Sequence, residues 1–192
     1  MFTSAISTAK RGALLIALLS LSSAWASAKY AVMPGSSLTY KMVHKLHEVE
    51  GVSKSVEGKA VVAEDGHVVV QARVKVESFD SNNGNRDAHM KEVTEASKFP
   101  YVEIKAASVP GAVPKGATQV NVPLKGKVTF HGIEQPFSTT VTVVFKDATH
   151  ATVSGGFPVS LEAHKIERPS LLTVKVSDEL KIDIKLVLEA EK

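Results

Sequence analysis

The sequence predicts an all-β fold, an eight-stranded antiparallel barrel with one short helix. Three observations point to it. Apolar residues recur at every second position over most of the chain, which is the period of a half-buried strand. Valine, whose branched side chain packs well on a pleated sheet, occurs 27 times after residue 28. Turn-forming pairs such as Asp65-Gly66 and His131-Gly132 separate many of the segments.

The first 28 of the 192 residues are expected to be a leader rather than part of the barrel. Lys10 and Arg11 form a basic start, residues 13–21 an apolar run, and Ala26 and Ala28 end possible A-x-A cleavage sites. This is the layout of a secretory signal peptide. The apolar run is far shorter than the roughly 20 residues of a membrane-spanning helix, so no integral membrane span is expected. The folded domain then covers residues 29–192.

Charge and cysteine content exclude several classes of function. Removal of the leader takes away Lys10 and Arg11 and no acidic residue, so the formal net charge falls from +3 to +1. A nearly neutral chain with interspersed charges does not indicate a nucleic-acid partner. The chain has no cysteine, which excludes disulfides, a thiol nucleophile and cysteine zinc sites.

The eight expected strands follow from the two-residue period. In chain order they are residues 38–46, 56–62, 68–76, 101–109, 120–130, 137–145, 152–157 and 180–188. Long antiparallel strands with short connections could form a sandwich or a barrel. An up-and-down barrel is favoured because closure removes the exposed sheet edges.

Residues 85–97 break this period and are expected to form a short helix between the third and fourth strands. Met90 and Val93 recur there at helical spacing. Asn85 is the expected N-cap, and Asp87 falls in the first turn, where the helix dipole favours an acid.

The inward face of the barrel is the expected ligand site. Several inward positions carry small residues, among them Gly58, Ala60 and Gly155, which leaves room for a long apolar guest. A core filled by its own side chains fits the pattern as well, and the sequence leaves both open. The positions expected to contact a guest are Val70, Ala72, Val74, Leu124, Gly126, Val128, Val141, Val143, Ile182 and Ile184.

His44 is expected to place an imidazole in the apolar interior, because it alternates in phase with Tyr40 and Met42. A buried polar group needs a partner, which would be a ligand head group, a buried side chain or a water molecule. His47 lies three positions further and points to the opposite face. The two histidines therefore cannot hold one ion, and no metal site is predicted.

Arg86 opens the expected helix and allows two interpretations. In a structural role it would pair with a neighbouring carboxylate. In a functional role it would hold an anionic head group together with the amides of the helix N-terminus. Charge alone does not separate the two.

Several segments resemble the YceI-like family. Residues 83–90 and 98–104 are similar to its RD-x-H-(L/M) and (F/Y)P-x-(I/V/A)-x-F signature. Residues 40–44 with Gly51 resemble the family's first strand. Residues 122–141, with the turn at Gly132 and Pro136 beyond it, resemble its G-x-(L/V)-T-(hydrophobic)-x-G-(V/I)-x-x-P hairpin.

The resemblance implies a lipocalin-like, elongated barrel in the periplasm whose tunnel binds a polyisoprenoid or similar long-chain lipid. One segment departs from the family. Members often carry an Arg-x-Asp-(Phe/Tyr)-Gly-like stretch before the last strand, whereas residues 161–172 contain no glycine. If this loop rims the tunnel, the identity of the ligand does not carry over.

Three functional hypotheses remain at this point. The first is a non-catalytic carrier of an isoprenoid or other amphiphilic lipid. The second is an envelope redox protein that acts through a bound isoprenoid quinone. The third is a small hydrolase or isomerase that uses His44 and Arg86. No nucleophile elbow, phosphate loop or dinucleotide fingerprint is present, so no catalytic residue and no cofactor is predicted. A homodimer is left open.

Overall fold

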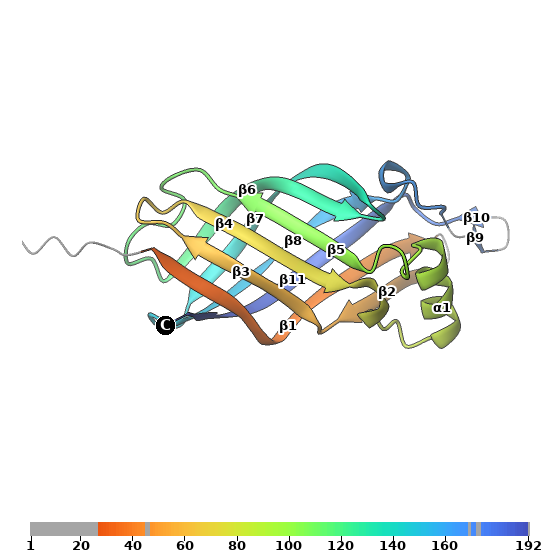
Figure 1. The fold of residues 1–192 in the computed structure, drawn as a ribbon, viewed down its shortest axis with the longest axis horizontal. Coiled ribbons are helices and arrows are strands. Elements are labelled where there is room, and N and C mark those ends of the chain that lie inside the picture. The colour runs from red at the N-terminus through yellow and green to blue at the C-terminus, as the bar shows by residue number, and fades with distance from the viewer. Residues whose placement is uncertain (1–26, 45–46, 169, 172–173, 192) are drawn as a thin grey trace, which may run out of the picture.

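The computed structural model describes residues 27–44, 47–168, 170–171 and 174–191 and shows an elongated β-barrel (Figure 1). Residues 1–26, which hold most of the expected leader, lie outside the described residues. The barrel strands are β1 (Ala28–His44), β2 (His47–Ser53), β3 (Val56–Val62), β4 (Val68–Lys75), β5 (Tyr101–Ala107), β6 (Gln119–Phe130), β7 (Ile133–Phe145), β8 (His150–Ser160) and β11 (Glu179–Ala190). The remaining elements are the pair β9 (Ser170–Leu171) and β10 (Val174–Lys175), the helix α1 (Gly84–Val93) and the 3-10 turns η1 (Val76–Ser78) and η2 (Glu162–His164).

The barrel closes through the pairing of its first and last strands. Neighbours follow the order β11-β8-β7-β6-β5-β4-β3-β1, and β1 also pairs with β11. The first residues of β1 pair with β3, and residues 38–44 pair with β2. Because β2 and β3 share one position in the wall, the barrel has eight strand positions, all antiparallel. The predicted eight-stranded antiparallel barrel is confirmed, whereas the predicted position of the helix among the strands is not.

Strand β1 has 17 residues and is nearly twice as long as its predicted counterpart, residues 38–46. Pro34 and Gly35 interrupt the alternation, and the strand register shifts between Met33 and Ser37. Gly35 has a φ of 96°, a conformation that glycine adopts without strain. The Ser36 hydroxyl donates to Met33 O at 2.7 Å and accepts from Val187 N at 2.9 Å. At this bend the Ser36 hydroxyl therefore supplies Val187 N with a hydrogen-bond acceptor in place of the β1 backbone.

The helix differs from its prediction in two respects. Since the short strand β2 was not predicted, α1 follows β4 rather than the third strand. Its N-cap is Asn83 and not Asn85, because the Asn83 side-chain oxygen accepts from Arg86 N at 3.0 Å. Asp87 lies in the first turn, as predicted.

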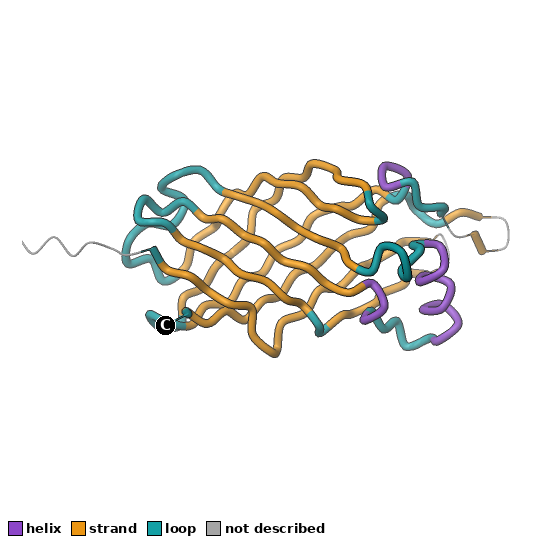
Figure 2. The backbone as a smooth tube through the Cα atoms, in the orientation of Figure 1, coloured by secondary structure: helices purple, strands orange, loops and turns teal. Residues whose placement is uncertain are grey.

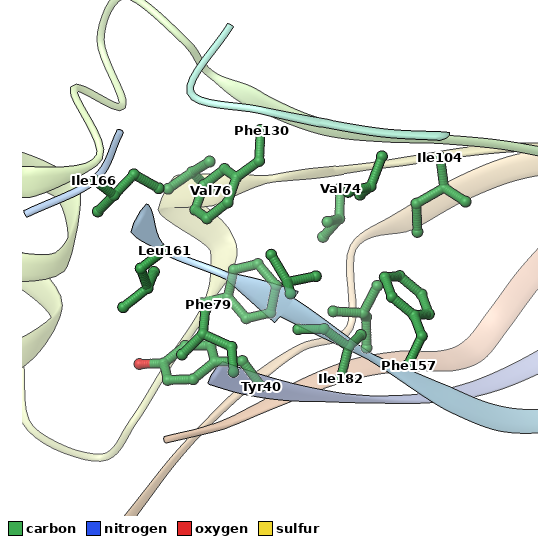
Figure 3. Packing of buried hydrophobic residues seen from close by; sticks show 14 of the residues in the cluster. Tyr40, Val74, Val76, Phe79, Ile104, Phe130, Phe157, Leu161, Ile166 and Ile182 are labelled. Atoms are coloured by element: carbon green, nitrogen blue, oxygen red, sulfur yellow. The ribbon is translucent and has the colours of Figure 1, made fainter. Parts of the chain in front are cut away.

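The barrel interior is apolar from end to end. Along β6 the buried Val122, Leu124 and Val128 alternate with exposed residues such as Lys125 and Lys127. The helical segments gather at one end of the barrel, opposite the end where β1 begins (Figure 2). A large buried cluster lies toward this helical end, and Figure 3 shows its side chains converging on a common interior space.

Two further properties concern the described part of the chain. None of its helices is long and apolar enough to cross a membrane. None of its histidine, aspartate and glutamate side chains form a group of three that could hold a metal ion.

Candidate functional site

The barrel interior contains two apolar cavities. The first measures about 140 Å³ and lies at the helical end. The second measures about 90 Å³ and lies toward the end where β1 begins and β11 finishes. Inward hydrocarbon side chains form nearly all of both linings. The arrangement suits apolar guests rather than polar substrates.

Helix α1 forms one wall of the first cavity. Arg86, Met90 and Val93 line it from successive turns, because residues three and four apart share one helix face. A hydrogen bond ties the helix start to the preceding loop, because the Asp87 carboxylate accepts from the Ser81 hydroxyl at 2.6 Å. At the other end the Thr94 hydroxyl donates to Met90 O at 2.7 Å and closes the last turn. The contact between Asp87 and Ser81 holds the helix start beside the cavity.

Arg86 is the cationic group of the first cavity. Among the described residues its guanidinium forms no ion pair with a carboxylate and no hydrogen bond, so the structural interpretation of Arg86 is not supported. Tyr40 lines the same cavity and lies close enough to Arg86 for the positive charge to affect its pKa. Burial and the nearby Asp87 raise the pKa of the Tyr40 phenol, and the positive charge of Arg86 opposes them. Arg86 therefore lies at the wall of the first cavity without a carboxylate partner among the described residues.

Tyr40 is placed by a glycine on the neighbouring strand. Tyr40 on β1 pairs with Gly51 on β2, and a Cβ at position 51 would lie 2.5 Å from the ring carbon Cζ. The ring covers the glycine and packs against Phe79, with ring centroids 5.4 Å apart. Any side chain at position 51 would push the tyrosine out of the cavity wall.

The structure brings most of the predicted contact positions to the cavities. Arg86, Val128 and Ile182 line the first cavity. The second cavity is lined by Val70, Ala72, Leu124, Val141, Val143 and Ile184. Whether these residues contact a ligand stays a prediction.

Three predicted positions fall elsewhere. Val74 is buried in the core cluster at the helical end but lines neither cavity. Gly126 also lines neither, because it lies against β5, where any side chain would collide with the Lys105 carbonyl and lie 2.6 Å from Ala106 Cα. His44 ends β1, and its side chain lies outside the described residues.

The sequence did not point to several lining residues. Phe79, Leu161 and Ile166 come from connections between strands, where no period indicates which side chain points inward. Met90 and Val93 had the helical spacing needed to assign them to the cavity face, but nothing in the sequence showed where the helix would dock.

Comparison with known proteins identifies the family. The family model described as YceI-like domain matches residues 30–188. The chain belongs to the YceI-like family. No curated protein matches the chain.

Solved structures agree with the YceI-like fold. A polyisoprenoid binding domain from Saccharophagus degradans, implicated in plant cell wall breakdown, is 16% identical with a TM-score of 0.70 over 84% of this chain and 98% of its own. BcnA of Burkholderia cenocepacia is 22% identical with a TM-score of 0.65, over 81% and 98%. A YceI protein of Campylobacter jejuni is 16% identical with a TM-score of 0.60, over 78% and 89%. At these identities the likeness concerns the fold.

Part of the glycine-free segment 161–172 of this YceI-like chain lies at the first cavity. Leu161 and Ile166 contribute to its lining. Between them His164 is almost fully buried, with Nδ1 2.8 Å from Ser160 O, and its own carbonyl lies 3.0 Å from Nδ1 of His131. Residues 161–166 therefore form part of the wall of the first cavity.

Proposed function

We propose that this protein is an exported, periplasmic, non-catalytic binding protein that holds a long-chain isoprenoid or similar amphiphilic lipid inside its barrel. The observation that carries the proposal is the apolar interior with its two cavities, one of which has Arg86 at its wall. Family membership supports the ligand class, as does the polyisoprenoid binding domain among the similar structures.

The two parts of such a ligand match the two kinds of lining. An apolar tail gains free energy from leaving water, about 0.8 kcal/mol for each buried methylene. An anionic head group at the helical end would meet the guanidinium of Arg86, which has no carboxylate partner among the described residues. The head group would stay near α1 while the tail points along the barrel axis.

The direct test is to identify what the protein carries. Protein purified from its native host is extracted with organic solvent, and the extract is analysed by mass spectrometry. A long-chain isoprenoid or amphiphilic lipid in near-stoichiometric amount is expected. A quinone head group would favour the redox hypothesis instead. Absence of any lipid, together with flat affinity across tails of increasing length, would contradict the carrier proposal.

A matched pair of variants ties the lipid to the interior. Ala72 lines the second cavity, whereas its neighbour Gln71 is exposed on the outer face. Ala72→Phe should reduce the amount of long-chain lipid recovered, and Gln71→Phe should not. Turnover of an ester or phosphate probe that is lost in His44→Ala would contradict the non-catalytic part of the proposal.

A further inference from the structure

Three buried side chains separate the two cavities. Leu38, Ile104 and Phe157 belong to the lining of both, and each is at most 8% exposed. A residue that lines two cavities stands at the boundary between them. We refer to these three residues as the partition.

The three residues of the partition lie on three different sides of the barrel wall. Leu38 lies on β1, Ile104 on β5 and Phe157 on β8. Following the closed strand order, β8 and β5 are three strands apart, β5 and β1 are again three apart, and β1 and β8 are two apart. Inward side chains from strands spaced this evenly meet near the barrel axis. They form a layer across the interior rather than a ridge along one wall.

Phe157 is the largest member of this layer, and its neighbours fix its position. It pairs with Ile182 across β8 and β11. Its ring lies against that of Phe137, with centroids 4.4 Å apart and planes inclined by 30°. In Figure 3 the ring projects into the interior beside Ile182 and Ile104. Open volume exists on both sides of the layer, so the ring has space into which it can be displaced.

The first cavity is small for a long tail. At about 140 Å³ it is similar to an engineered apolar cavity of about 150 Å³ that takes up one benzene molecule. A short apolar tail can fill such a space with little rearrangement. A long chain that starts at the helical end has to pass the partition before it can use the second cavity.

We infer that Leu38, Ile104 and Phe157 determine which tail lengths the barrel accepts, with Phe157 as the residue that must move when a long tail passes. This inference rests on the proposed lipid-binding function and specifies its selectivity. The first cavity accepts the proximal part of the tail. The second cavity adds affinity only when the Phe157 ring has been displaced.

The test is a series of linear alkyl monophosphates of increasing length, measured by calorimetry on the wild-type protein, Phe157→Ala and Phe145→Ala. Phe145 is the matched control because it lines the second cavity but not the first. In the wild-type protein the affinity should rise about fourfold for each added methylene among short tails. Once the tail is long enough to reach the partition, the gain in affinity for each further methylene should fall below twofold.

We call the tail length at which the gain in affinity falls the break. Phe157→Ala should move the break to longer tails, and Phe145→Ala should leave it at the wild-type length. Should Phe157→Ala fail to fold, Phe157→Leu should move the break in the same direction by a smaller amount. An identical break in the wild-type protein and the foldable Phe157 variant would overturn the inference, as would a wild-type affinity that rises without any break. Failure of every tail, including the shortest, to bind would overturn the proposed function and this inference with it.

Discussion

The two cavities share one apolar interior but are enclosed by different kinds of structure. The second is surrounded almost entirely by inward side chains of regular strands. The first also takes residues from α1, from the segment after η1 and from the connection that follows β8. Arg86 belongs to the first cavity alone. The strands therefore provide apolar volume, and the connections provide the chemistry that can select a head group.

A charge buried in the second cavity, which strands enclose, should lower the stability of the fold more than one in the first cavity. Ile184 lines the second cavity, so Ile184→Asp would leave an unpaired carboxylate in an apolar interior. The expected loss is more than about 3 kcal/mol of unfolding free energy. Lys185→Asp on the exposed outer face should change it by about 0.5 kcal/mol or less. Denaturant unfolding measures both, and equal midpoints would show that the register of β11 is wrong.

A smaller loss is expected where two strands approach closely. A methyl group at position 126 would collide with the backbone of β5, so Gly126→Ala should cost about 2 kcal/mol through overpacking. Gly84→Ala is the matched control, because a Cβ there meets nothing within 4 Å and alanine favours the helix. Thermal unfolding should separate the two variants. A wild-type melting temperature for Gly126→Ala would refute the close packing of β5 and β6.

At the helical end the expected effect is on affinity rather than stability. Arg86→Ala should weaken binding of a prenyl monophosphate by about 1.5 kcal/mol, roughly tenfold, through loss of a charged hydrogen bond. The corresponding prenyl alcohol should bind with unchanged affinity. Lys91→Ala, an exposed position of the same helix outside the cavity lining, serves as the control in calorimetry. Equal weakening of phosphate and alcohol would exclude a head-group role for Arg86.

The smallest effect concerns the start of the helix. Asn83→Ala removes the side-chain cap of α1 and should cost about 1 kcal/mol. Asn85→Ala should be neutral, since Asn85 is exposed and does not cap the helix. Urea unfolding measures the pair. A larger loss of stability for Asn85→Ala than for Asn83→Ala would indicate that Asn85 is the N-cap, as the sequence pattern predicted.

Sequence reasoning succeeds for the strands of the barrel. All eight predicted strands are present, and the inward phase of Val128, Val141 and Ile182 agrees with their burial. Alternation is a local property that each strand carries in its own residues, so it can be identified without knowledge of the partners. The alternation is interrupted where β1 bends at Pro34 and Gly35, because a bulge changes which face each residue points to.

The assignment of the helix cap failed for a related reason. Asn83 and Asn85 are both acceptable cap residues, and the choice between them depends on where the backbone turns into the helix. The Asp87 carboxylate, which accepts hydrogen bonds from Ser81, contributes to that choice through the preceding loop. Composition alone does not reveal this contact.

The sequence by itself determined the all-β class, the number of strand positions in the barrel, the face on which most apolar residues lie and the family signature. The tertiary structure decided that Gly126 packs against β5, that Arg86 lines the first cavity and that Leu38, Ile104 and Phe157 line both cavities. The physical reason is distance along the chain. Alternation and helical spacing connect residues a few positions apart, whereas the partition joins residues on β1, β5 and β8 that come together only when the barrel closes.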